Sequence, residues 1–381
     1  MKKIPKRILS GLLCCAVALG LTAYLGVVFS SARKAEPIYP GPGVTEKKML
    51  SDYYDGLKGT AGDTEVYVLD SGVPGASMLV LGGTHPNEPS GVVAAVSLIE
   101  TCQPTSGVLY VIPRANNSAF SCTDPGEAAP MTYSVETAGG DRWFRFGSRA
   151  TNPIDQWPDN ETYVLEQFGQ TLSGSETRNL NRAYPGKTDG TLTEKVTYGI
   201  RSMIDAESID ITVDLHEASP EYTTVDAIVA HQRALELANL TLWGVEDSFE
   251  ISVEASPTNL HGLSHRELGD FTDTLALLME TANASQGRLH GVIDSDLVVS
   301  GEDKFYKRAD EYGALTVDYS DGAISLTERC ARHITCLVQF CENYEGENGA
   351  SISLGDMPSF EDMMENGIGA YLASPQEESN D

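Results

Sequence analysis

The chain has 381 residues, of which 41% are hydrophobic, so it is long enough and apolar enough for one large globular domain or two small ones. Its formal net charge is −29, and the first 34 positions hold six basic residues and no acid, so the remainder carries about −35. So acidic a body should repel nucleic acid and anionic lipid surfaces, which argues against nucleic-acid binding.

An uncharged apolar stretch covers residues 8–29 and follows four lysines and arginines. It is long enough to span a bilayer as a helix and longer than an ordinary signal-peptide core. The positive flank predicts that the N-terminus stays inside and that the body lies outside the cytoplasmic membrane. Cleavage after Ser30-Ser31-Ala32 would release the body instead, so a membrane-anchored and a secreted protein both remain open.

Four segments are predicted along the chain. Residues 1–34 form a signal anchor or transmembrane segment, and residues 35–50, rich in Pro and Gly at their start, form a linker off the membrane. Residues 51–345 form the folded domain. Residues 346–381 are rich in Gly, Ser and acidic side chains and are predicted to be a largely disordered tail.

Apolar runs typical of buried strands alternate with helical patterns through the folded domain. Helices are expected over residues 91–100 and after the capping boxes Thr191–Glu194 and Ser325–Glu328. This alternation predicts an α/β fold with a mostly parallel or mixed central sheet and helices on both faces. The segment 142–175 lacks periodicity and is either an insertion that shapes a substrate site or a surface loop. The predicted strands cover residues 78–81, 108–112, 209–215, 226–230 and 275–279.

Five cysteines lie outside the apolar N-terminal stretch, and none is in a CxxC pair, which disfavours a thiolate zinc site or a redox motif. Cys330 and Cys341 fall on the apolar stripe of a predicted helix. Burial as small hydrophobic side chains is therefore their expected role, with a disulfide as the alternative.

The first candidate for chemistry is the segment LGGTHPNEPSG at residues 81–91. A strand ends, two glycines turn the chain, and His85 and Glu88 follow at HxxE spacing. An imidazole and a carboxylate at this spacing can converge on a small ion such as zinc, which takes three protein ligands in catalytic sites. Alone, such a pair is more often a surface pair.

His216 is the candidate for a third ligand, because it lies near the end of the predicted strand ITVDLHE. Asp214 lies two residues earlier and so shares one face of that strand with His216. It could orient a ligating imidazole, or it could have a simple strand-end role.

Two further segments carry polar groups suited to hydrolysis. In RNLNRAYPG, Asn181 and Arg182 place an amide beside a guanidinium, which can hold a carboxylate through two hydrogen bonds, and Arg178 could face the scissile carbonyl. Glu280 terminates an apolar strand, where packing explains a carboxylate poorly and a general base would be well placed. The alternatives are surface salt bridges for the arginines and a salt bridge at the sheet edge for Glu280.

These four motifs in this order resemble the pattern of the zinc carboxypeptidase superfamily, and their wording is similar to its succinylglutamate desuccinylase/aspartoacylase branch. The resemblance covers about residues 77–344. It implies a carboxypeptidase-like fold and one Zn²⁺ per chain, held by His85, Glu88 and His216.

The resemblance also assigns the remaining roles. Asn181 and Arg182 would bind the substrate carboxylate, and Glu280 would activate water. Arg178 would help to polarise the carbonyl, although the corresponding arginine of the family lies further before the NR pair. The candidates that could replace Arg178 are Arg142, Arg145 and Arg149.

The function predicted from these residues is zinc-dependent hydrolysis of an amide bond in a peptide or N-acyl amino acid with a free carboxylate, by a deacylase or an exopeptidase. The expected partners are that small substrate and the membrane, through the N-terminal helix. A non-catalytic extracytoplasmic binding protein that reuses the same fold is the alternative.

Overall fold

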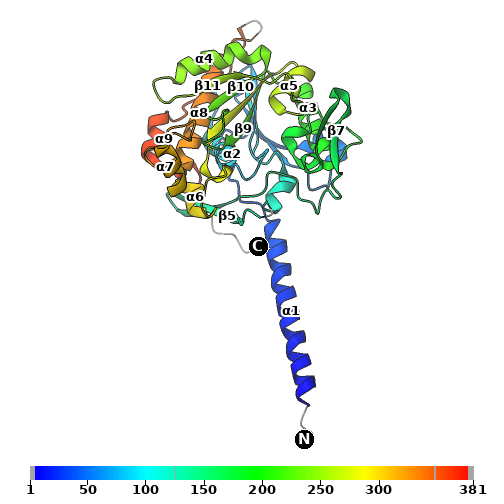
Figure 1. The fold of residues 1–381 in the computed structure, drawn as a ribbon. Helices are drawn as coiled ribbons and strands as arrows, with labels where there is room; N and C mark the ends of the chain where they lie inside the picture. Colours follow the sequence, from blue (N-terminus) through cyan, green and yellow to red (C-terminus); the bar gives the residue numbers. More distant parts are fainter. Residues whose placement is uncertain (1–4, 125, 347–348, 376–381) are drawn as a thin grey trace.

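The computed structural model describes residues 5–124, 126–346 and 349–375. A rounded body sits at one end of a long helix, α1 (Lys6–Ala32), which projects away from it, as Figure 1 shows. No residue of α1 is buried, and the helix is long and apolar enough to cross a membrane. By length and composition it fits either a signal anchor or a signal sequence.

The body is built on one eight-stranded mixed sheet, ordered β1-β2-β4-β3-β9-β12-β10-β11. Its central strands β4, β3, β9 and β12 are parallel, whereas β1, β2 and β10 are antiparallel to neighbours on the inner side. The predicted α/β class with a mixed sheet is confirmed. The strands are β1 (Glu46–Met49), β2 (Glu65–Asp70), β3 (Ser77–Leu81), β4 (Val108–Ile112), β9 (Ile211–Ala218), β10 (Ala227–Ala230), β11 (Ser252–Ala255) and β12 (Leu275–Ala282).

The sheet is covered on both faces, because alternate residues of its strands belong to two separate cores. In β3, Met78 and Val80 pack in one core, and Leu79 and Leu81 pack in the other. The first core includes residues of α2 (Pro89–Thr101), α4 (Leu235–Val245), α6 (Ser295–Ser300) and α8 (Leu326–Asn343). The second includes residues of α3 (Leu192–Glu207) and α5 (Ser264–Phe271). The short helix α7 (Lys304–Glu311) follows α6, and the short helix α9 (Phe360–Asn366) follows α8.

The start signals predicted for two helices are present. Thr191 and Glu194 form a reciprocal capping box at α3, and the Ser325 side chain accepts a hydrogen bond from the Glu328 N–H at α8. Cys330 and Cys341 are buried on α8, and all seven cysteines are free thiols.

The segment without periodicity, residues 142–175, contains parts of two small hairpins outside the main sheet. The prediction relied on continuous apolar runs and missed these strands, three of which alternate buried or half-buried residues with exposed ones. The hairpins pair β5 (Thr132–Thr137) with β6 (Gly140–Arg145) and β7 (Thr162–Leu165) with β8 (Gln170–Ser173).

The structure differs from the sequence prediction at both ends of the body. Residues 35–50 are not a free linker, because Glu36 and Leu50 are buried and β1 pairs with β2. Of the predicted disordered tail, residues 347–348 and 376–381 lie outside the described residues, but residues 349–375 are ordered, because they contain α9 and pack apolar side chains into the first core. The average composition of such a segment hides its few well-placed apolar residues. The buried ones are Ile352, Leu354, Met363, Ile368 and Leu372.

Candidate metal centre

The candidate ligands meet at the carboxyl edge of the parallel strands, where α/β proteins place their sites. β3 ends at Leu81, and the following turn carries His85 and Glu88 to the start of α2. His216 lies on β9, which is parallel to β3. Gly83 in this turn has a φ of 66°, which favours glycine. Gly91 lies in the first turn of α2, where a Cβ would be 2.6 Å from the Leu215 carbonyl oxygen, so the glycine lets α2 approach β9 closely.

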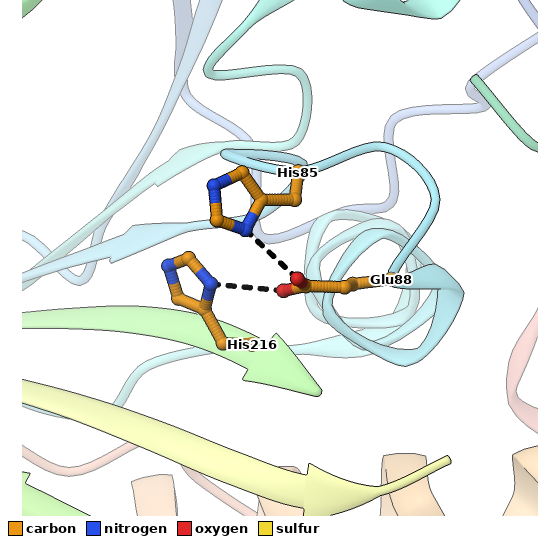
Figure 2. A group of neighbouring side chains, drawn as sticks. All are labelled: His85, Glu88 and His216. Atoms are coloured by element: carbon orange, nitrogen blue, oxygen red, sulfur yellow. Dashed lines mark hydrogen bonds and ion pairs between the residues drawn. The ribbon is translucent and has the colours of Figure 1, made fainter. Parts of the chain in front are cut away.

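His85, Glu88 and His216 are all buried, and their potential ligand atoms lie within 4.8 Å of one another. Both imidazoles point at the Glu88 carboxylate, as Figure 2 shows. Each Nδ1 lies 2.8 Å from a different Glu88 oxygen, His85 from Oε1 and His216 from Oε2. Two imidazole nitrogens and one carboxylate form a donor set that suits zinc in catalytic sites.

A second layer of polar groups fixes the ligands. His216 Nε2 lies 3.0 Å from Asp214 Oδ2, as the strand-face argument suggested. Asp214 is held in turn by the hydroxyls of Thr84 and Ser264, at 2.7 and 2.5 Å. On the other imidazole, His85 Nε2 lies 2.9 Å from Asn179 Oδ1. Such partners orient a ligating imidazole and fix its tautomer.

The electrostatics of the cluster follow from burial and close charges. Burial by itself would raise the pKa of Glu88, but the adjacent His85 and His216 imidazoles lower it well below its usual range. Burial would lower the pKa of His216, but the carboxylates of Asp214 and Glu88 raise it well above its usual value. The lowered pKa favours the ionised form of Glu88, which is the form that a cation requires.

Glu280 is brought next to this cluster by strand register. β12 is parallel to β9, and Glu280 pairs with His216 across the two strands. Its Oε2 atom is shielded from solvent and has no hydrogen-bond partner within the described part of the chain. Burial, followed by the charge of Glu88, raises the pKa of Glu280 to about 8, against the opposing charge on His216. Such an unpartnered carboxyl group has no structural task that would explain it.

A cleft of about 870 Å³ opens beside the cluster, and its lining includes Arg149, Asn179 and Arg182. Arg149 connects the cleft to the cluster, since its guanidinium lies 3.2 Å from Glu88 Oε1 and 3.3 Å from His85 Nδ1. Burial, then repulsion from Arg149, lowers the pKa of Arg182. Arg149 and Arg182 are two of the four arginines that line this cleft in a strongly acidic protein.

The other predicted site residues have different surroundings. Arg178 also lines the cleft, but its guanidinium makes two hydrogen bonds to Asp159, at 2.7 and 2.9 Å, and a third to the Thr151 carbonyl. Asn181 is buried, and its Oδ1 accepts a hydrogen bond from the Ser264 backbone. Asn181 is not among the residues that line the cleft, whereas its neighbour Asn179 is.

Of the alternative arginines, only Arg149 reaches the cluster. Arg142 is buried in an ion pair with Glu100, and Arg145 binds backbone carbonyls of Ser31 and Lys34. Sequence reasoning missed Asn179, Thr84 and Ser264 because their partners come from distant parts of the chain. The only signals available were that Thr84 precedes His85 and that Asn179 follows Arg178, and no such signal marked Ser264.

A search with protein-family models finds no match, and neither does a search of curated proteins. Solved structures do match. The chain is similar in structure to succinylglutamate desuccinylases and aspartoacylases. A succinylglutamate desuccinylase from Silicibacter sp. TM1040 aligns over 86% of this chain and 74% of its own, with 16% identity and a TM-score of 0.43.

Two further matches cover less of the matched chain. A succinylglutamate desuccinylase/aspartoacylase from Rhodobacter sphaeroides aligns over 76% of this chain and 64% of its own, with 15% identity and a TM-score of 0.39. The tripeptide-bound cell shape determinant Csd4 from Helicobacter pylori aligns over 76% and 55%, with 11% identity and a TM-score of 0.39. With identities of 11–16% and TM-scores of 0.39–0.43, the similarity concerns the fold, and the function is inferred from the residues of this chain.

Proposed function

We propose that this chain is a zinc-dependent hydrolase that cleaves an amide bond in a peptide or N-acyl amino acid with a free carboxylate. The observation that carries the proposal is the buried convergence of His85, Glu88 and His216 beside the unpartnered carboxyl group of Glu280. Zinc bound by the three ligands would supply a Lewis acid and would lower the pKa of water to about 7.

The side chains of this chain would do the rest. Glu280 would accept a proton from the attacking water and deliver it to the leaving nitrogen. Arg149, which faces both the cluster and the cleft, would stabilise the negative charge that develops on the carbonyl oxygen. This gives Arg149 the role that the family resemblance placed on Arg178, whose guanidinium is already engaged by Asp159.

Arg182 would hold the substrate carboxylate, because it lines the cleft and its only ion pair within the described chain is a long one, 3.9 Å to Glu176. Asn181 would act one step further back. It holds the backbone of Ser264, whose hydroxyl donates to Asp214, and Asp214 orients His216. Asn181, which adjoins the carboxylate-binding Arg182, would therefore be linked through Ser264 and Asp214 to the zinc ligand His216.

Replacing Arg182 by alanine should weaken hydrolysis most for substrates with a free carboxylate. The loss removes a charged hydrogen-bonding partner, which is worth about 1.5–3 kcal/mol, or roughly tenfold to a hundredfold in kcat/KM. The measurement compares each substrate with its C-terminal amide, for which the loss should be small. The matched variant Arg149→Ala should slow the acid and the amide alike. Equal losses for acid and amide in Arg182→Ala would contradict the assignment.

The body should lie outside the cytoplasmic membrane, because the basic residues precede the apolar span of α1. Protease added to intact cells should therefore digest the body, or the body should be found in the medium if α1 is cleaved as a signal sequence. A body that resists external protease but is digested from the cytoplasmic side would show the opposite orientation.

A further inference from the structure

No flexible linker separates α1 from the body, because the residues at the end of α1 contact the body directly. α1 ends at Ala32, and the next residue, Arg33, already makes an ion pair of 3.0 Å with Asp155 of the body. Arg145 donates hydrogen bonds to the carbonyl oxygens of Ser31 and Lys34. The last turn of α1 is therefore part of the contact with the body.

The following residues are held more firmly still. Glu36 is buried and pairs with Arg114 at 2.6 Å. Arg142 is buried and donates at 2.6 Å both to the Pro37 carbonyl and to Glu100. A segment tied by buried ion pairs cannot act as a flexible spacer, since breaking such a pair leaves an uncompensated buried charge.

The fixed attachment sets the height of the body above a membrane spanned by α1. The apolar stretch ends at Phe29, four residues before Arg33, which is about 6 Å along a helix. The polar headgroup layer on each side of a bilayer is about 5–7 Å thick. Arg33, and Asp155 paired with it, would therefore lie at headgroup level.

Two large apolar side chains flank Asp155 at that level. Ile154 is 63% exposed and Trp157 is 72% exposed. Trp157 is two residues from Asp155, so it is within about 7 Å of it along the chain. Tryptophan is enriched where a protein meets the membrane–water interface. Ile154 also lines the cleft, so the cleft opens next to this loop.

We propose that Ile154 and Trp157 insert into the bilayer interface beside α1 and so hold the mouth of the cleft at the membrane surface. This inference rests on α1 being a retained membrane anchor and on the proposed hydrolase function. If both hold, the enzyme would act on carboxylate-bearing peptides or acyl amino acids presented at the membrane surface.

The full-length chain, reconstituted into phosphatidylcholine liposomes, provides the test. Zwitterionic lipid is used because the body carries about −35 in charge and would be repelled by anionic lipid. Trp143→Phe with Trp243→Phe leaves Trp157 as the only tryptophan, since the chain has three. Lipids brominated in the acyl chains should lower its fluorescence by about twofold or more if the indole lies in the interface.

The matched control keeps Trp243 instead, with Trp143→Phe and Trp157→Phe. Trp243 is also exposed, at 62%, but lies on α4, at the end of the body away from α1 (Figure 1). Its fluorescence should not change. The proposed contact of Trp157 with the bilayer would be overturned by equal quenching of Trp157 and Trp243. It would also be overturned if Trp157 were not quenched in protein that floats with the liposomes. If the protein does not float with the liposomes, α1 is not a membrane anchor and the proposed contact falls with it. Zinc content and hydrolysis, measured on the same sample, test the proposed function separately.

Discussion

Glu280→Gln should keep the fold and the zinc yet lower kcat by roughly two to four powers of ten. Glutamine has the same shape as glutamate but cannot take up the proton of the attacking water. Glu280 Oε2 has no hydrogen-bond partner to lose, so the amide should fit without disturbing the neighbours. The measurement is the turnover number on any substrate that the parent cleaves, together with zinc content and thermal unfolding of both proteins.

Unchanged turnover in Glu280→Gln would move the general-base role elsewhere. Glu217 is the neighbouring carboxylate, since it follows His216 in β9. Glu217 lines the cleft but is poorly suited to replace Glu280, because its side chain is bound by Arg329 at 2.5 Å and by Asn283 at 2.9 Å. Each of its two oxygens already accepts a hydrogen bond from one of these donors, so neither is free to face an attacking water.

That buried pair leads to the second large effect. Arg329→Met should lower the free energy of unfolding by about 3–5 kcal/mol, because it leaves the Glu217 carboxylate buried without its countercharge. Both side chains are fully buried. The Glu217 backbone N–H donates to Glu88 Oε2 at 3.1 Å, so the pair also supports the ligand set. Denaturant unfolding of the full chain measures the loss.

The control is an arginine whose ion pair is exposed. Arg308 pairs with Glu311 at 3.2 Å, with side chains 65% and 56% exposed. Arg308→Ala should cost under about 1 kcal/mol, because water screens such a pair. Adding Glu217→Gln to Arg329→Met should restore part of the stability, since the uncompensated charge is removed. Similar stability in Arg329→Met and Arg308→Ala would contradict the role of the buried pair.

The sequence predicted most about the site where apolar runs mark buried strands and candidate site residues follow or end those strands. The apolar runs that became β3, β4, β9 and β12 were recognisable because strands buried on both faces read as continuous apolar segments. His85, Glu88, His216 and Glu280 could be grouped because they follow or end such strands, and the structure brings them to one edge. Their roles in binding and catalysis remain predictions.

What the sequence could not predict depends on contacts between distant segments. Arg149 was one of several candidate arginines, and only the fold shows that it reaches Glu88. The partner of Glu217 lies 112 residues away on α8. The attachment of residues 33–37 to the body was also invisible, because a Pro- and Gly-rich composition suggests a linker whether or not its few charged residues find buried partners.

The most direct test of the central claim is the zinc content of the purified protein, measured by elemental analysis. About one zinc per chain is expected, because one buried set of three ligands is present among the described residues. His85→Ala and His216→Ala should each abolish zinc binding, whereas His290→Ala, whose imidazole hydrogen-bonds only to the neighbouring Gly291 carbonyl within the described chain, should retain it. Full zinc retention in both His85→Ala and His216→Ala would contradict the metal centre and, with it, the proposed hydrolase.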